Sequence, residues 1–209
     1  TTIFIYTIFG YKLILKFINE ILPLIDHKTN LIIGGTDYTF PNNTDIRMQD
    51  AVNRKIFGSE PFPEHELNKI TSSPFINKIF VENLDADFHK AYPIPLGVDR
   101  SAPQLPDKPH LFVQIEYFQK FYNLNASKPL KFTYFNRVRR SPQFKERRDV
   151  LSLCQTTWSK HYHESTLSKS HSEYLEIMGS CLFTICVHGG GLDVNPKLWE
   201  ALLIGVIPI

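Results

Sequence analysis

The sequence has few cysteines, almost no net charge and no long apolar run. Its three cysteines, Cys154, Cys181 and Cys186, are an odd number without the clustering of a metal site. The formal net charge of +2 gives no reason to expect a nucleic-acid partner. The apolar N-terminal stretch is interrupted by Lys12 and Lys16, well short of the roughly 18 apolar residues that a membrane span needs, and it has no basic leader. We therefore expect neither a signal peptide nor a membrane anchor within this chain.

Several common signatures are missing as well. The chain has no internal repeat, no low-complexity tract and no Ser-His-Asp set with a nucleophile elbow, which disfavours an α/β-hydrolase. Only Gly10 stands in the first predicted strand–helix turn, so the Gly-x-Gly-x-x-Gly pattern of dinucleotide-binding enzymes is absent there. The spacing of His161, His163 and His171 matches no standard zinc pattern, and no acid or thiol completes a ligand set. We therefore predict no metal site.

What the sequence does contain is a regular alternation of strand and helix patterns, with 43% apolar residues to build a core. This alternation predicts an α/β protein built from parallel strand–helix–strand units. Three prolines between residues 99 and 109 predict a loop or linker, which divides the chain into domains at 1–108 and 109–209. The predicted strands are 3–7, 31–33, 76–81, 130–135, 158–162, 183–187 and 206–209, with an extended segment at 91–96. The predicted helices are 11–22, 46–57, 110–122, 144–153, 172–179 and 197–203.

The last 27 residues combine these patterns with a glycine loop and charged side chains. A short apolar run at 183–187 predicts a buried strand, and three glycines follow it directly: Gly189, Gly190 and Gly191. Asp193 or Asn195 can cap the next helix, and Pro196 suits its first position. Bare loop amides and a helix N-terminus at the carboxyl edge of a parallel sheet can bind phosphate, although such a glycine cluster is also an ordinary tight turn.

Charged residues near this loop extend the phosphate hypothesis. Lys197 and Glu200 are three residues apart, so they share a helix face near its start, close to Asp193 in the sequence. A cation there can hold a diphosphate, and an acid there can hold ribose hydroxyls. Arg137 follows the predicted strand at 130–135, where a basic loop can face a diphosphate or simply be solvated. His188 can donate to a phosphate or only hydrogen-bond the loop.

The segment GGGLDVNPKLWEALLIGVIPI, residues 189–209, resembles the C-terminal signature of the exostosin-like glycosyltransferases. Weaker matches lie upstream in the right order: VENLD at 81–85 with YPIPLGVD at 92–99, and IIGGTD at 32–37. Together they span roughly residues 30 to 209. Many members of that family carry Arg where this chain has Lys197, and the spacing from Asp193 to Glu200 is one residue longer here. Lysine is a point charge and not a bidentate fork, which changes the geometry of a phosphate contact.

The resemblance implies the GT-B fold, in which two Rossmann-like lobes face a cleft. The donor nucleotide binds the C-terminal lobe and the acceptor binds the N-terminal lobe. Because the sequence stops within a predicted strand, we expect the second lobe to be incomplete at its end. In such a fold the donor-binding residues of this chain would be Arg137, His188, Gly189, Gly190, Gly191, Asp193, Lys197 and Glu200.

The implied activity is transfer of a sugar from a nucleotide-sugar, with a UDP-sugar as first choice, to a glycan or glycoprotein acceptor. Inverting transfer needs a carboxylate base near the acceptor hydroxyl. We take Asp37 as the first candidate, with Glu82 and Asp85 as alternatives, although a turn or capping role is the ordinary one for such residues. No cofactor is required in such folds, since cations and helix amides offset the diphosphate charge, although some enzymes use manganese. The family works at Golgi or secretory membranes, whereas a viral or microbial member would be cytoplasmic.

A second hypothesis comes from another functional class. The lysine in place of arginine and the early stop of the chain also fit a non-catalytic lobe that holds a nucleotide or a glycan. This alternative predicts nucleotide binding without turnover.

Overall fold

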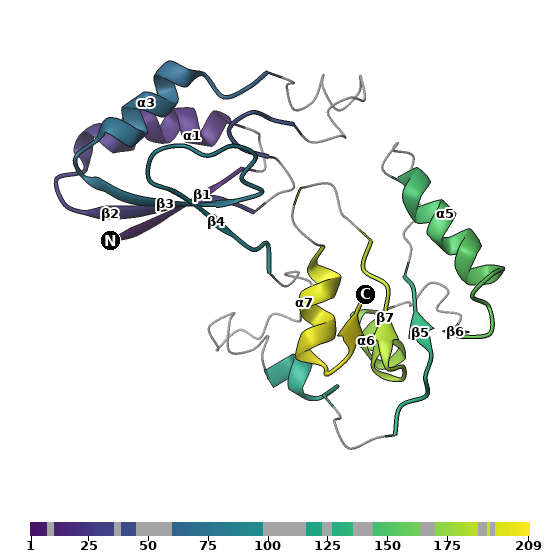
Figure 1. Ribbon diagram of the computed structural model, residues 1–209. Helices are drawn as coiled ribbons and strands as arrows, with labels where there is room; N and C mark the ends of the chain where they lie inside the picture. The colour runs from purple at the N-terminus through teal and green to yellow at the C-terminus, as the bar shows by residue number, and fades with distance from the viewer. Residues whose placement is uncertain are drawn as a thin grey trace. The chain divides into compact units, whose positions relative to one another are not determined.

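A computed structural model shows an α/β protein with two separate four-stranded parallel sheets (Figure 1). The structure describes residues 1–7, 11–35, 39–44, 60–97, 116–122, 127–135, 144–163, 170–187, 192 and 195–209. Contacts divide these residues into two compact units: unit 1 is Thr1–Leu96 together with Leu192, and unit 2 is the rest of the described residues from Gly97 onward. The domain boundary predicted between residues 108 and 109 lies outside the described residues. None of the helices in the described part of the chain is long and apolar enough to cross a membrane.

Unit 1 holds four parallel strands in the order of the chain. β1 (Thr2–Tyr6), β2 (Thr29–Gly34), β3 (Ile76–Glu82) and β4 (Ala91–Ile94) lie side by side in that order. Among the described residues, the helical segments that connect them are α1 (Lys12–Lys16) and α3 (Glu64–Ser72). α1 continues through a π-helical turn, η1 (Phe17–Ile21), into a 3-10 turn, η2 (Leu22–Leu24). The position of Pro93 in β4 is explained because an edge strand tolerates a residue without a backbone donor.

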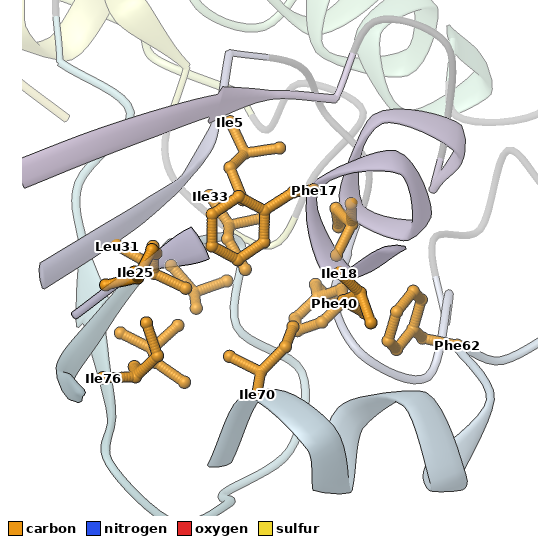
Figure 2. Close-up of a cluster of buried hydrophobic side chains, with 13 residues drawn as sticks. Ile5, Phe17, Ile18, Ile25, Leu31, Ile33, Phe40, Phe62, Ile70 and Ile76 are labelled. Atoms are coloured by element: carbon orange, nitrogen blue, oxygen red, sulfur yellow. The ribbon is translucent and has the colours of Figure 1, made fainter. Parts of the chain in front are cut away.

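The strand order of unit 1 places its helices on one face of the sheet. Parallel crossovers are right-handed, so strands added always in the same direction put every crossover on the same side. α1 and α3 accordingly lie over one side of the sheet (Figure 1). Figure 2 shows the core between these layers, with strand residues such as Ile33 facing Phe17 and Ile70 from the helices. On the other face, Phe4 and Tyr92 each keep 46% of their surface exposed.

Unit 2 is wound differently. Its strands are β5 (Phe132–Thr133), β6 (Tyr162–His163), β7 (Phe183–Thr184) and β8 (Ile207–Pro208), in the spatial order β6-β5-β7-β8. The helices that connect them are α5 (Phe144–Gln155), α6 (His171–Gly179) and α7 (Pro196–Leu203). From β5 the chain first adds β6 on one side, then returns to add β7 and β8 on the other. The strand order therefore reverses between β5 and β7.

This reversal puts helices on both faces of the second sheet. The hydroxyl of Tyr134 donates to the backbone oxygen of Arg147 in α5 at 3.0 Å, which ties one face to that helix. The next residue, Phe135, packs its ring edge against Tyr174 of α6, with 4.5 Å between ring centroids. Consecutive residues of an extended segment point to opposite faces. A core of aromatic and aliphatic residues joins α6, α7 and the helical turn at 116–119: Tyr117, Phe118, Leu175, Met178, Ala201, Ile204 and Val206.

Most predicted elements agree with these bounds, but one helix was not predicted and one strand was predicted with the wrong start. α3 was not predicted, because its sequence EHELNKITS carries only two large apolar residues and so gives a weak helical stripe. The strand predicted at 158–162 begins only at Tyr162, because residues 156–161 form turns. The predicted helix at 46–57 lies outside the described residues, as does the first part of the one predicted at 110–122.

Candidate functional site

The candidate site lies at the carboxyl ends of β5 and β7, where the strand order reverses. In open parallel sheets the loops after two such strands lead to opposite faces, so a crevice opens between them. The residues after β5 are Tyr134 and Phe135, and those after β7 lead through Cys186 to the start of α7. Unit 1 has no such reversal among its described strands. The topology of the fold therefore favours unit 2 as the place for a ligand.

The start of α7 is fixed by a side-chain cap. Asn195 accepts a hydrogen bond from the backbone N–H of Lys197 at 2.9 Å through its side-chain oxygen, and its amide nitrogen donates to the backbone oxygen of Val187. Pro196 follows at the first helical position, where a missing N–H costs nothing. Of the two cap candidates in the sequence, Asn195 is the cap that the structure shows. The same side chain thereby ties the helix start to the segment after β7.

Lys197 connects α7 to the segment that follows β5. Its ammonium donates to the backbone oxygen of Phe135, and the nitrogen lies 5.8 Å from the centroid of the Tyr134 ring. The side chain thus crosses from the helix that follows β7 to the end of β5. A cation is therefore held at the switch point of the sheet, next to the N-terminal end of α7.

Glu200 is a buried carboxylate one turn further along α7, with 4% of the residue exposed. Its oxygens are held by two residues of α6. His171 Nε2 lies 3.0 Å from Oε1, and the hydroxyl of Tyr174 donates to Oε2 at 2.7 Å. A buried carboxylate is costly unless it accepts hydrogen bonds, so these two partners make its burial tolerable.

Aromatic rings surround the two α6 partners. The His171 ring stacks between those of Tyr117 and Tyr174, with ring centroids 5.7 Å and 5.5 Å away. Phe118 makes an edge-to-face contact with His171, and Phe135 makes one with Tyr174. The rings keep the side chains that hold Glu200 in fixed orientations.

The thiol of Cys186 lies near both charged residues of α7. Burial raises the pKa of Cys186 to about 11, while the Lys197 ammonium acts to lower it and the Glu200 carboxylate to raise it. At neutral pH the thiol is therefore protonated, and it acts as a small apolar group in the site. Its response to both charges indicates that Lys197 and Glu200 act on the same small region after β7.

Of the residues predicted to bind the donor, the structure describes Lys197 and Glu200 and brings them to one region. The others lie outside the described residues: Arg137, His188, Gly189, Gly190, Gly191 and Asp193. Asp37, the first candidate for the base, lies outside them too.

The two alternative bases lie in unit 1. Asp85 accepts hydrogen bonds from the backbone N–H groups of Asn42 and Thr44, at 2.9 Å and 3.1 Å, and from the Thr44 hydroxyl at 3.0 Å, so it acts as a turn cap. Glu82, at the carboxyl end of β3, accepts from the backbone N–H of Gly35 at 2.5 Å.

His171, Tyr174 and Tyr117 were not predicted to be parts of this site. His171 was considered only as a metal ligand, and within the described ranges no group of three His, Cys, Asp or Glu residues could hold a metal ion. One signal was present, because residues 171 and 174 are three apart and so share a helix face. The local pattern does not indicate which helix packs against the face that carries residues 171 and 174.

Comparisons with known proteins give no family assignment. A scan against protein-family models finds no match for this chain, and a search of curated proteins finds no significant match either.

Proposed function

We propose that this protein is a glycosyltransferase that moves a sugar from a nucleotide-sugar, with a UDP-sugar as first choice, to a glycan or glycoprotein acceptor. One observation carries the proposal. A cation, Lys197, and a buried carboxylate, Glu200, stand on the first two turns of the helix that begins at the switch point of a parallel sheet. α/β folds bind nucleotides at such a switch point. Here Lys197 could bind the diphosphate of a nucleotide, and Glu200 could bind its ribose hydroxyls.

Lys197 would stabilise the leaving group. When the bond between the sugar and the diphosphate breaks, negative charge grows on the diphosphate, and a fixed cation lowers the barrier by stabilising that charge. The ammonium now donates to the backbone oxygen of Phe135. A lysine carries its charge on a flexible four-carbon stem, so it can turn from a carbonyl towards a phosphate oxygen. The positive end of the α7 dipole would add to this effect.

Glu200 would bind the ribose of the donor. An ionised carboxylate accepts hydrogen bonds through about four lone-pair directions. His171 and Tyr174 use one on each oxygen, which leaves capacity for the two hydroxyls of a ribose. The side chain therefore suits a ligand with paired hydroxyl donors.

The finer architecture belongs to the same proposal. Two units with parallel sheets are compatible with Rossmann-like lobes, and a GT-B arrangement would give the donor to unit 2 and the acceptor to unit 1. Asp37 would act there as the base, and Arg137 would join Lys197 at the diphosphate. In this arrangement the cations and helix amides do the work that a metal ion does in other transferases.

A second candidate function is favoured by the hydrogen bonds of Glu200. Both oxygens already have a partner within the protein, and the side chain is 5% exposed. A carboxylate that is satisfied in this way also fits a purely structural role in a non-catalytic lobe. That lobe would bind a nucleotide or a glycan without turnover.

The test combines nucleotide binding with turnover. We would titrate the purified protein with UDP and with GDP by calorimetry, and then measure release of UDP from a panel of UDP-sugars with and without glycan acceptors. We expect UDP to bind and one UDP-sugar to be turned over. Lys197→Met should weaken binding about tenfold or more, because an interaction between two charged groups is lost.

Lys128→Met is the matched control for Lys197→Met. The Lys128 ammonium also donates to a backbone oxygen of unit 2, that of Gly205 at 3.0 Å, but beyond the other end of α7. Equal losses in the two variants would show a general effect of removing a lysine. Failure of the wild-type protein to bind either nucleotide would overturn the transferase and leave only a glycan-binding lobe. Binding without release from any donor would select the non-catalytic one.

A further inference from the structure

We propose that His171 and Tyr174 are positioning residues that hold the Glu200 carboxylate for a ribose diol, so that the site selects ribonucleotides over 2′-deoxyribonucleotides. This inference rests on the proposed function, because it takes the ligand of unit 2 to be a nucleoside diphosphate. It adds to the proposed site a specificity for ribonucleotides and two residues of α6, His171 and Tyr174.

The geometry of the carboxylate carries the first step. A glutamate side chain turns about three bonds and loses up to roughly 2 kcal/mol of rotamer freedom when it is held in one conformation. Two hydrogen bonds from α6 hold the Glu200 carboxylate, one from His171 to Oε1 and one from Tyr174 to Oε2. One contact would still let the group rotate, whereas contacts on both oxygens fix its plane.

The two donors are themselves held by packing. They are three residues apart on α6, so they project from the same face of that helix. Their rings stack on one another at 5.5 Å with 21° between the planes, and Tyr117 stacks on the outer side of His171. The Tyr117 hydroxyl lies 3.1 Å from the Ser172 hydroxyl and so does not compete for Glu200. The donors thus have little freedom of their own.

The two partners of Glu200 face it as hydrogen-bond donors. Among the described residues, the buried Nδ1 of His171 has no hydrogen-bond partner, so the ring meets Glu200 through Nε2. Nε2–H and the Tyr174 hydroxyl both donate to the carboxylate, one to each oxygen. An ionised carboxylate can only accept, and ribose hydroxyls are donors.

This arrangement predicts discrimination at the ribose. A nucleotide that lacks the 2′-hydroxyl cannot donate one of the hydrogen bonds for which the Glu200 carboxylate is positioned. One acceptor position of the buried carboxylate then stays unsatisfied. A hydrogen bond to a charged group is worth about 1.5–3 kcal/mol, so the wild-type protein should bind UDP roughly 10- to 100-fold more tightly than 2′-deoxy-UDP. A carboxylate that is free to rotate would lose much of this preference.

The experiment is a calorimetric titration with UDP and 2′-deoxy-UDP, and with the matching guanine pair, for the wild-type protein and three variants. Tyr174→Phe removes one hydroxyl and keeps the ring. We expect it to reduce the preference for UDP by about tenfold, through weaker binding of UDP and little change for 2′-deoxy-UDP. His171→Gln keeps an N–H donor near the position of Nε2 and should retain most of the preference. Tyr117→Phe is the control, because it loses an equivalent hydroxyl that does not bond to Glu200.

Each outcome has a distinct meaning. Loss of preference in Tyr174→Phe, with preference kept in Tyr117→Phe, supports the inference. An unchanged preference in Tyr174→Phe overturns it and leaves the proposed function standing, as does a wild-type protein that binds both nucleotides equally. A wild-type protein that binds no nucleotide overturns the inference and the proposed function together. A purely structural role for Tyr174 would weaken binding of both nucleotides alike, which also contradicts the inference.

Discussion

Replacing Glu200 by alanine should destabilise unit 2 strongly, because the carboxylate satisfies two buried donors. In Glu200→Ala, His171 Nε2–H and the Tyr174 hydroxyl lose an acceptor at 3.0 Å and 2.7 Å in a largely buried site. An orphaned buried donor costs about 1–3 kcal/mol, and more when its partner was charged. We therefore expect the free energy of unfolding to fall by about 3–5 kcal/mol, a large part of a typical domain stability of about 5–15 kcal/mol.

Two further variants separate the carboxylate's roles. Glu200→Gln keeps one acceptor oxygen for His171, and its new amide can donate to the Tyr174 hydroxyl, so it should cost only about 1 kcal/mol. The double variant Glu200→Ala, Tyr174→Phe removes one of the orphaned hydroxyls. It should be less destabilised than the sum of the single variants by about 1–2 kcal/mol. The direction of this coupling follows from the hydrogen bond alone.

Urea unfolding followed by tryptophan fluorescence is a suitable assay. The chain has two tryptophans, and both Trp158 and Trp199 lie in unit 2, so the signal reports the unit that contains Glu200. Comparing midpoints at a constant slope then gives the change in stability. A loss below about 1 kcal/mol in Glu200→Ala would refute the reasoning, since a buried carboxylate with two partners cannot be removed so cheaply. Additive effects in the double variant would refute the contact with Tyr174.

Three other predictions test the local structure. Gly35→Ala should lower the melting temperature of the protein far more than Gly97→Ala does, because both glycines have positive φ (91° and 75°) but only at Gly35 would the new Cβ overlap the Tyr6 ring. Similar shifts of the two variants in circular dichroism melts would contradict this. Asn195→Ala should cost unit 2 about 1–2 kcal/mol in urea unfolding through loss of the α7 cap, whereas Asn195→Ser should retain most of that stability. Alkylation of Cys186 by iodoacetamide should stay slow through pH 9 and rise only as the pH approaches about 11, because burial raises the pKa of the thiol. Peptide mass spectrometry measures the rate, and fast alkylation at pH 8 would show that the thiol is exposed to water.

Burial of a second thiol, that of Cys154, makes the stability of the protein depend on pH above about pH 9. Burial raises the pKa of Cys154 to about 11 from an ordinary value of 9.0, so the unfolded chain releases this proton first as the pH rises. The contribution of the thiol to stability is therefore complete below about pH 9 and is lost between about pH 9 and 11, with a slope of up to about 1.4 kcal/mol per pH unit. Cys154→Val should remove that part of the slope.

Much of the fold follows from local patterns in the sequence. The run 183–187 predicted a strand, and β7 lies within it; the stripe at 197–203 predicted the helix that the structure gives as α7. These predictions succeed because apolar spacing and caps act within a few residues. α3 escaped prediction because its stripe consists of little more than Leu67 and Ile70, and unit 1 supplies the missing stability by packing Ile70 against the sheet.

What the sequence determined by itself is the alternation of strands and helices and the placement of Lys197 and Glu200 on one helix face, three residues apart. The tertiary structure alone decided which residues meet them. His171 and Tyr174 are 29 and 26 residues from Glu200, and Phe135 is 62 residues from Lys197. The strand order β6-β5-β7-β8 makes these neighbours, because the reversal brings the ends of β5 and β7 together and packs α6 on α7. Helix patterns are set by bonds four residues apart, whereas a site is set by the packing of whole elements, and no local spacing encodes that.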